Sequence, residues 1–305
     1  MAPTRIKFWG VRGSIPTPGP QTIRYGGNTS CVEIQFPDIP RFIVDAGSGI
    51  RELGKELLQA VDPVKAYIFL SHFHWDHIQG LPFFKPAFKP GNHFILYGCD
   101  EPDVDLTKII SMQMNPIYFP VAVEDMGAKV EFRTVMEEAF DVEGVTVQTQ
   151  FMNHPGYTFG FRFTYNDKTI VYISDNEPYI QPKDEIEEEP SFAGTLEDRF
   201  ERFVDDKEAR LVEFVSNADI LIHDTQYFPD EYEQRITWGH SPYTYTVDIA
   251  VKGKVKQLIL FHHDPDHDDE TVDKLTELSR DRLKKHSYHI PCHAAQEGAV
   301  IELFD

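Results

Sequence analysis

The sequence has 305 residues, 41% of them hydrophobic and 26% charged, which is the composition of a folded globular protein rather than a disordered one. Fifty acidic residues against 29 lysines and arginines give a formal net charge of −21 at pH 7. This balance removes the basic surface with which proteins bind long nucleic acids or anionic membranes.

The three cysteines, Cys31, Cys99 and Cys292, are odd in number and widely spaced, which is not the pattern of a disulfide framework. The first residues, MAPTRIKFWG, contain no apolar signal-peptide segment, and no apolar run reaches 18 residues. We therefore expect a cytoplasmic protein that is neither secreted nor inserted in a membrane.

Ten short β-rich runs recur along the chain, and several are continuous apolar segments, as is typical of strands covered on both faces. They read RIKFWG, CVEIQF, RFIVDAG, AYIFLS, HFILYG, VTVQTQF, FGFRFTY, TIVYISD, DILIHD and QLILFHH. Helical patterns alternate with them at Gly49–Ala60, around Leu196–Val215, near Tyr245–Val251 and at Asp269–Lys285. The alternation predicts a layered α/β protein with sheets inside and helices outside.

Acidic residues and prolines crowd together between Glu177 and Arg210. We interpret this segment as an insertion, at about residues 177–210, in a single domain that covers residues 1–305. Two interpretations of the insertion stay open: a lid or oligomer contact, and a solvated acidic loop that leads into a surface helix.

The stretch SHFHWDH, which follows the apolar run AYIFL, places four potential metal ligands within six residues: His72, His74, Asp76 and His77. Packing does not explain this cluster, because four ionisable groups would need burial partners at once. Four ligands are also too many for one tetrahedral ion that keeps an open position. The spacing therefore indicates two ions that share the loop.

Further candidate ligands stand where other apolar strands end, which is where α/β folds gather functional groups. His154 follows Val145–Phe151, Asp175 follows Thr169–Ile173, and His262 and His263 follow Gln257–Phe261. Each residue alone could be an ordinary polar loop residue, but together they complete a ligand set for two ions.

These motifs resemble the metallo-β-lactamase-fold hydrolases, and within them the phosphodiesterase branch that includes ribonuclease Z and the phosphoribosyl 1,2-cyclic phosphodiesterases. The matching stretches are FWGVRGSIPTPGP, RYGGNTSCVEI, DAGSGI, SHFHWDH, NHPG, SDNE, LIHDTQY, WGHS and LFHHDP. The H-x-H-x-D-H signature is specific for the fold, whereas WGHS and the glycine-rich N-terminal motif select the branch. The resemblance implies a four-layer αββα sandwich with a dinuclear site at the edge where the two sheets meet.

The ligands that the resemblance implies form two sets and a bridge: His72, His74 and His154 for one ion, Asp76, His77 and His262 for the other, and Asp175 between them. His263 is the alternative to His262. Asp45 is expected to support the histidine loop, because metal-bound imidazoles usually need a carboxylate or carbonyl partner. We expect two divalent ions, zinc in the first place, with manganese or iron as alternatives, since such ligand sets accept several first-row metals.

The resemblance also implies that a metal-bridging hydroxide attacks the phosphorus and that His240, in TWGHS, protonates the leaving group or contacts the phosphate. LIHDTQYF resembles the branch's His-Glu-Ala-Thr motif, with Asp224 at the position of the longer acid, and Asp224 would then orient and charge His240. We expect Asp76 to act in catalysis as well as to bind metal. The alternative for His240 is a buried structural histidine held by Ser241, and His223 is interpreted as structural.

A ribonuclease acting on tRNA would need a basic surface and, in ribonuclease Z, an arm between the third and fourth metal motifs. Only 20 residues separate His154 from Asp175 here. We therefore predict hydrolysis of a small anionic phosphodiester, such as a cyclic nucleotide or phosphoribosyl cyclic phosphate, without long nucleic acid or membrane as a partner. The alternatives are hydrolysis of a C–O, C–N or thioester bond and a non-catalytic metal- or nucleotide-binding sensor. Because many relatives pair through surfaces near the site, a homodimer is one expected oligomeric state.

Overall fold

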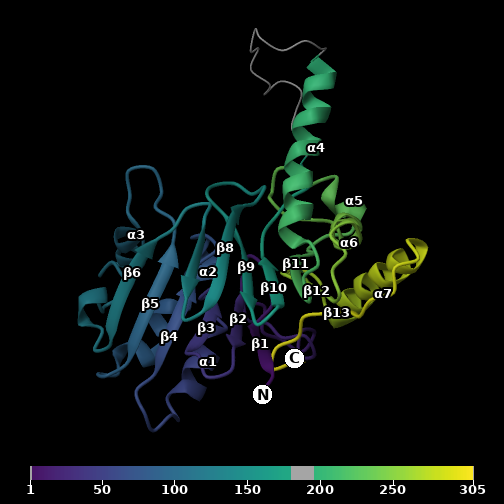
Figure 1. The fold of residues 1–305 in the computed structure, drawn as a ribbon. Coiled ribbons are helices and arrows are strands. Elements are labelled where there is room, and N and C mark those ends of the chain that lie inside the picture. The colour runs from purple at the N-terminus through teal and green to yellow at the C-terminus, as the bar shows by residue number, and fades with distance from the viewer. Residues whose placement is uncertain (1, 180–195, 305) are drawn as a thin grey trace.

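Two seven-stranded sheets form the centre of the computed structural model, which describes residues 2–179 and 196–304, apart from the side chains of residues 196–205 (Figure 1). The first sheet has the strand order β14-β1-β2-β3-β4-β5-β6. Its strands are Thr4–Gly10 (β1), Cys31–Gln35 (β2), Arg41–Val44 (β3), Lys65–Phe69 (β4), His93–Gly98 (β5), Lys129–Thr134 (β6) and Val300–Leu303 (β14). Strands β3 to β6 are parallel, whereas β14, β1, β2 and β3 pair antiparallel.

The second sheet has the order β13-β12-β11-β10-β9-β8-β7. Its strands are Ala139–Val142 (β7), Val145–Phe151 (β8), Phe159–Tyr165 (β9), Lys168–Ile173 (β10), Ile220–Asp224 (β11), Leu258–Phe261 (β12) and Cys292–Ala294 (β13). Strands β10 to β13 run parallel, so their C-terminal ends lie at one edge of the sheet. This edge carries the polar residues that follow the strands.

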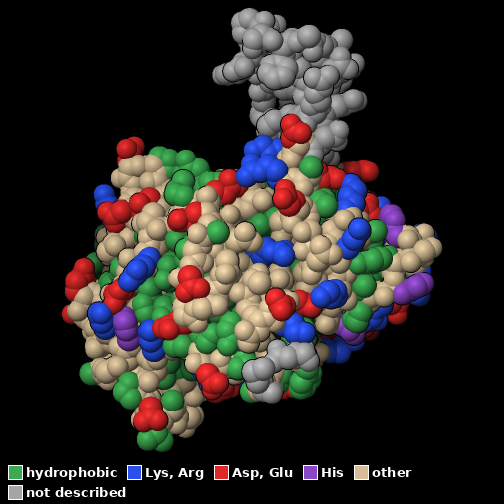
Figure 2. Space-filling model, in the orientation of Figure 1, with side chains coloured by type: hydrophobic (Ala, Val, Ile, Leu, Met, Phe, Trp, Pro, Cys, Tyr) green, Lys and Arg blue, Asp and Glu red, His purple; other side chains and the backbone are tan. Residues whose placement is uncertain are grey.

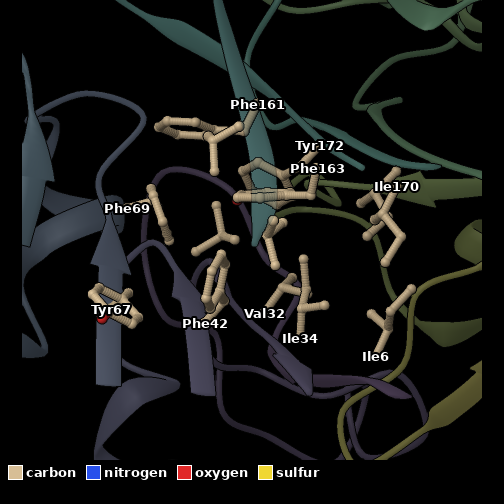
Figure 3. Packing of buried hydrophobic residues seen from close by; sticks show 14 of the residues in the cluster. Ile6, Val32, Ile34, Phe42, Tyr67, Phe69, Phe161, Phe163, Ile170 and Tyr172 are labelled. Atoms are coloured by element: carbon tan, nitrogen blue, oxygen red, sulfur yellow. The ribbon is translucent and has the colours of Figure 1, made fainter. Parts of the chain in front are cut away.

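An aromatic core joins the two sheets face to face (Figure 3). Phe42 and Phe69 of the first sheet pack against Phe163 of the second, with ring centroids 5.9 and 5.3 Å away. Alternate residues of β1, such as Ile6 and Phe8, are fully buried in the same core. Each such side chain contributes about 1.5–3 kcal/mol by leaving water, so the inter-sheet layer holds the scaffold rigid.

Helices cover the outer face of each sheet. Ile50–Leu57 (α1) and Leu106–Gln113 (α3) pack on the first sheet, and Leu196–Val215 (α4), Tyr243–Lys252 (α6) and Asp269–Lys285 (α7) pack on the second. The shorter helical segments are Trp75–Ile78 (α2), Pro229–Tyr232 (α5) and the 3₁₀ turns Leu81–Phe83, Lys85–Phe88 and Val123–Asp125. The layers are therefore helix, sheet, sheet, helix, which confirms the predicted αββα sandwich.

All ten predicted strands are present, and α4 and α7 have the predicted bounds. Helix α1 is shorter than the predicted Gly49–Ala60, and α6 extends beyond Tyr245–Val251 at both ends. Strands β6, β7, β13 and β14 were not predicted, because edge strands such as β6 and β14 are half exposed and lack a continuous apolar run. Within the predicted acidic insertion, residues 180–195 lie outside the described residues.

In the part of the chain that the structure describes, no helix combines the length and the apolar character needed to cross a bilayer.

Candidate metal centre

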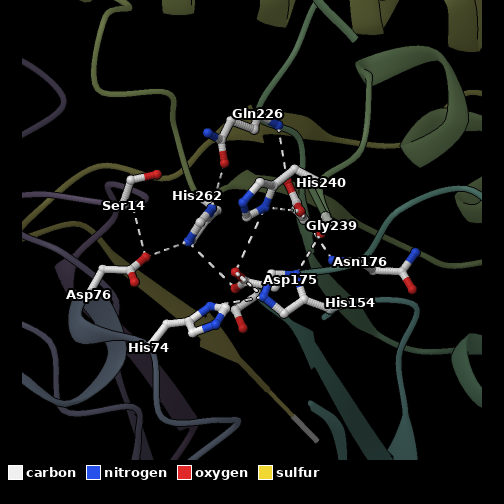
Figure 4. Close-up of polar contacts among 12 residues, drawn as sticks. Ser14, His74, Asp76, His154, Asp175, Asn176, Gln226, Gly239, His240 and His262 are labelled. Atoms are coloured by element: carbon white, nitrogen blue, oxygen red, sulfur yellow. Dashed lines mark hydrogen bonds and ion pairs between the residues drawn. The ribbon is translucent and has the colours of Figure 1, made fainter. Parts of the chain in front are cut away.

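The seven predicted metal ligands lie together where the C-terminal ends of strands from both sheets converge. Figure 4 labels five of them: His74, Asp76, His154, Asp175 and His262. The loop after β4 leads into the short helix α2 and carries the histidine cluster, while β8, β10 and β12 end just before the remaining ligands. Because parallel strands of one sheet end at the same edge, β10, β11 and β12 deliver Asp175, Asp224 and His262 side by side.

One group of ligand atoms comes from His72, His74 and His154, whose donor atoms all lie within 4.8 Å of one another. The Nε2 atom of His154 is 3.1 Å from Nδ1 of His74. The ring centroids of His72 and His154 are 4.8 Å apart and their planes are tilted by 67°, so the imidazoles converge rather than stack. Three converging imidazoles form a donor set that suits a first-row divalent metal.

The second group comprises Asp76, His77, Asp175 and His262, all buried, with their ligand atoms also within 4.8 Å. Nε2 of His77 lies 3.1 Å from Oδ2 of Asp76 and 3.3 Å from Nε2 of His262. Nε2 of His262 is 3.1 Å from Oδ2 of Asp76. This set combines imidazole nitrogens with carboxylate oxygens, a second combination that divalent metals accept.

Asp175 lies between the two groups and turns a different oxygen toward each. Its Oδ1 is 3.1 Å from Nε2 of His77 and 3.5 Å from Nε2 of His262. Its Oδ2 is 3.7 Å from Nε2 of His72 and 3.8 Å from Nε2 of His154. One carboxylate could therefore contact ions in both groups.

Outer hydrogen bonds fix which nitrogen each of three imidazoles directs inward. The Nδ1 of His77 donates to Oδ2 of Asp45 at 2.8 Å, and the Nδ1 of His154 donates to the carbonyl of Gly239 at 3.0 Å. The Nδ1 of His262 donates to Oε1 of Gln226 at 2.9 Å. In the neutral tautomers the inward Nε2 atoms are then lone-pair donors, as metal-bound histidines require.

Ionisation in the cluster favours the metal-binding forms of several ligands. Burial lowers the pKa of His154 to about 4 and that of His72 well below its ordinary value. Burial alone would raise the pKa of Asp175, but the neighbouring histidines, His262 and His77 foremost, hold it well below its usual range. Neutral imidazoles beside an ionised carboxylate are the protonation states that bind a divalent cation.

His77 behaves differently, because three carboxylates surround it. Burial lowers its pKa, but Asp175, Asp76 and Asp45 outweigh that effect and raise the pKa well above the ordinary value. A cation near Nε2 would satisfy the same negative charges. Two buried atoms, Nε2 of His72 and Oδ1 of Asp175, have no hydrogen-bond partner among the described residues, and a metal ion would give both atoms a partner. The donor set therefore fits divalent metal.

His240 and Asp224 form a hydrogen-bonded pair beside the two ligand groups. Nδ1 of His240 lies 3.0 Å from Oδ2 of Asp224, and the His240 ring stacks on His262 with centroids 4.9 Å apart. Burial lowers the pKa of His240, but the charge and hydrogen bond of Asp224 outweigh it and raise the pKa to about 9. Ser241, the alternative partner, instead donates its hydroxyl to the carbonyl of Asn176.

The other candidate histidines point elsewhere. Nε2 of His263 donates to the carbonyl of Ala295 at 2.9 Å, and Nδ1 of His223 donates to the carbonyl of Asp224 at 2.7 Å. Of the HH pair, it is therefore His262 that lies among the ligand atoms.

The N-terminal loop also contacts this site. Its sequence, within FWGVRGSIPTPGP, indicated a match to the family but no contact with the ligands. The backbone N–H of Ser14 donates to Oδ2 of Asp76 at 2.8 Å, with Ser14 itself at a φ of 63°. A Cβ on Gly13 would lie 2.5 Å from the ring of His262, so only glycine lets this loop approach the histidine. Gln226 was likewise not predicted, because nothing in the sequence near His262 indicates its partner.

Comparison with known proteins identifies the family and the fold of the chain. A family model described as a β-lactamase superfamily domain matches residues 40–191, about half of the chain. Ribonuclease Z from Thermoplasma acidophilum is 24% identical over 298 residues, which cover 88% of this chain and 89% of that protein.

Two solved structures share the fold at low sequence identity. The metallo-beta-lactamase fold protein YhfI from Bacillus subtilis has a TM-score of 0.66 at 18% identity and covers 98% of this chain and 100% of its own. Unliganded yeast PDE1 has a TM-score of 0.68 at 14% identity, over 99% of this chain and 100% of its own.

Proposed function

This chain belongs to the metallo-β-lactamase superfamily and is a metal-dependent hydrolase, and from this premise we propose that it hydrolyses a small phosphodiester with two bound divalent ions. The observation that supports the proposal most is the position of Asp175, whose two oxygens face two separate groups of ligand atoms. A carboxylate that faces two ligand groups is an arrangement that suits a dinuclear site.

The proposed ligands are His72, His74 and His154 for one ion and Asp76, His77 and His262 for the other, with Asp175 shared. When bound, two such ions supply Lewis-acid stabilisation of the phosphoryl group and a nucleophile at neutral pH. The chain contributes the orientation of the ligands. Asp45, Gln226 and the carbonyl of Gly239 hold the outer nitrogens of three imidazoles.

His240 is the proposed general acid, which donates a proton to the departing alkoxide. The carboxylate of Asp224 raises the pKa of the imidazole and so favours its protonated form, and it engages Nδ1. Nε2 is then the ring atom left to carry the proton to the substrate. The burial of Asp224 among hydrogen-bond donors, including the backbone N–H of Asn176 at 3.1 Å, fixes its carboxylate for this task.

A small substrate is favoured by the charge of the protein. The net charge of −21 opposes the approach of a long polyanion, and Figure 2 shows acidic and basic side chains interspersed over the visible face. A short cyclic diester needs to contact only the ions and the residues around them. A reducing compartment such as the cytoplasm belongs to the same proposal, supported by three buried cysteines that form no disulfide.

RNA cleavage is the second candidate, because the sequence relative named above is a ribonuclease. The two candidates can be separated by assaying metal-loaded protein on a panel of cyclic nucleotides, phosphoribosyl cyclic phosphate and a precursor tRNA. We expect turnover of at least one small diester, lost in His240→Ala, and no cleavage of the tRNA.

Efficient tRNA cleavage without turnover of small diesters would replace the small-substrate proposal with a ribonuclease. Turnover confined to lactones, thioesters or amides would contradict a phosphodiesterase of either kind. Stoichiometric nucleotide binding without turnover in any assay would instead favour the sensor interpretation.

A further inference from the structure

The loop that carries His240, residues 237–240 between α5 and α6, has an unfavourable backbone. Thr237 has a φ of 78° and Gly239 a φ of 87°. A β-branched residue at positive φ is a true outlier, because its side chain crowds the backbone. Such a conformation persists only where surrounding contacts hold it in place.

One buried carboxylate, Glu177, supplies those contacts. Its Oε1 accepts the backbone N–H of Thr237 at 2.7 Å and its Oε2 accepts the backbone N–H of Gly239 at 3.1 Å. The hydroxyl of Tyr232 donates to Oε1 at 3.0 Å. The side chain therefore bridges the two residues of the loop that adopt the left-handed conformation. Glu177 is only 7% exposed, so water competes little for these bonds.

The 237–240 loop contacts a proposed metal ligand and also carries the proposed general acid. The carbonyl of Gly239 accepts from Nδ1 of His154, a proposed ligand, and the next residue is His240 (Figure 4). The approach to His154 is so close that a Cβ on Gly239 would lie 2.0 Å from that Nδ1. A shift of the loop would therefore move the acid and the outer partner of a ligand together.

Glu177 is itself fixed to the segment that carries His154. Its backbone N–H donates to the carbonyl of Asn153 at 2.7 Å, and Nδ2 of Asn153 donates back to the carbonyl of Glu177 at 3.1 Å. The backbone N–H of Asn153 also donates to Oδ1 of Asn176 at 3.0 Å. Glu177 thus links the segment that carries His154 to the loop that carries His240.

We propose that Glu177 is a positioning residue that holds the 237–240 loop in its strained form and thereby places His240 against the leaving group. This inference rests on the proposed function, in which His240 protonates that group. On enzyme saturated with metal, a bound ion would also hold His154, so loss of Glu177 should impair proton donation more than metal chemistry.

The test compares two substrates on enzyme saturated with metal: methyl p-nitrophenyl phosphate, whose leaving group needs no acid, and methyl phenyl phosphate, whose leaving group does. We expect Glu177→Ala and the milder Glu177→Gln to lower kcat on the phenyl ester at least about 10-fold more than on the nitrophenyl ester. In Glu177→Gln an amide NH₂ would face one of the two backbone donors, so one of the two loop hydrogen bonds is lost without a change of size.

Two further variants and a spectroscopic readout make the result decisive. Glu231→Gln, which changes a carboxylate of α5 that instead accepts from Phe228 and His267, should leave the ratio of the two rates unchanged. His240→Ala should show the same selective loss as the Glu177 variants. The ring NMR signals of His240 should shift in Glu177→Gln and stay in place in Glu231→Gln.

Two outcomes would overturn the role of Glu177. One is an unshifted His240 ring signal in Glu177→Gln. The other is an equal loss of kcat on both esters in the Glu177 variants while the loss in His240→Ala is selective. If His240→Ala instead lowered kcat equally on both esters, His240 would not be the acid. If the His240 ring signals still shifted in Glu177→Gln, the role of Glu177 in positioning the loop would stand.

Discussion

Imidazole orientation is set residue by residue, through hydrogen bonds to the ring nitrogen that faces away from the ligand cluster. The three outer acceptors differ in kind: the carboxylate of Asp45, the amide of Gln226 and the carbonyl of Gly239. The sequence allowed only the first to be predicted, because Asp45 stands in a recognisable motif. Gln226 is 36 residues from His262 and reaches it only through the pairing of β11 with β12, which no local pattern reveals.

Replacing Gln226 should weaken metal binding without unfolding the protein. Gln226→Ala removes the acceptor that orients His262, so we expect metal affinity to fall about 10- to 100-fold. Competition with a chelator of known affinity measures the change. Gln226→Glu, which keeps an acceptor oxygen, is the matched control and should bind metal more tightly than the alanine variant. Equal affinities of wild type and Gln226→Ala would contradict the assigned role.

The His240 pair predicts a pH dependence. Without bound metal the pKa of His240 is about 9, above the ordinary value of 6.5, and Asp224 keeps it raised; the protonated acid is therefore lost only as the pH rises through this raised pKa. For a substrate with a poor leaving group, kcat should therefore be level near neutral pH and fall at high pH. Asp224→Asn removes the negative charge that raises this pKa most, so the falling limb should move to lower pH.

The check is a pair of kcat profiles against pH for wild type and Asp224→Asn on methyl phenyl phosphate. Asp175 and Asp76 also raise this pKa in the metal-free protein, and bound ions would offset their contributions but leave the contact with Asp224 in place. A falling limb at the same pH in both proteins would show that Asp224 does not charge the acid.

At the level of elements, the site depends on where strands stop rather than on the strands themselves. Strands β10, β11 and β12 end within two residues of Asp175, Asp224 and His262, and the parallel register brings these ends together. The continuous apolar runs made these strands and their ends predictable from the sequence. The edge strands β6 and β14 were not predicted because all their residues are half-buried or exposed, and tertiary pairing rather than composition makes them strands.

The aromatic layer between the sheets is expected to support stability rather than chemistry. Phe163→Ala deletes a fully buried ring that packs against Phe42 and Phe69, and should lower the free energy of unfolding by about 3–5 kcal/mol. Denaturant titration measures the loss, and kcat of the folded fraction should change little. A loss below about 1 kcal/mol would mean that the sheets repack around the missing ring.

Considered as a whole, the molecule concentrates buried negative charge at one edge of the sandwich. Asp45, Asp76, Asp175 and Asp224 are each at most 5% exposed and lie within one network of histidines. Family membership could be read from the sequence because these residues fall in short motifs. Glu177 shows the limit: its partners lie 60 and 62 residues away, and only the folded chain brings them together.

Metal removal should therefore destabilise the whole protein. Ions that bind only the folded state stabilise it by about 2.7 kcal/mol at one hundred times their dissociation constant. We expect a chelator to lower the Tm by several degrees and added zinc to restore it, as measured by calorimetry. Asp175→Asn, which lacks the shared carboxylate, should show a smaller change in Tm. A wild-type Tm that changes with neither chelator nor added metal would contradict a metal-stabilised fold.

The most direct test of the account is a crystal structure of metal-loaded protein with anomalous diffraction recorded at the metal absorption edge. We predict two anomalous peaks per chain about 3.5–4 Å apart. One should be ligated by His72, His74 and His154, the other by Asp76, His77 and His262, with Asp175 contacting both. A single peak at saturating metal, or two peaks without Asp175 between them, would contradict it.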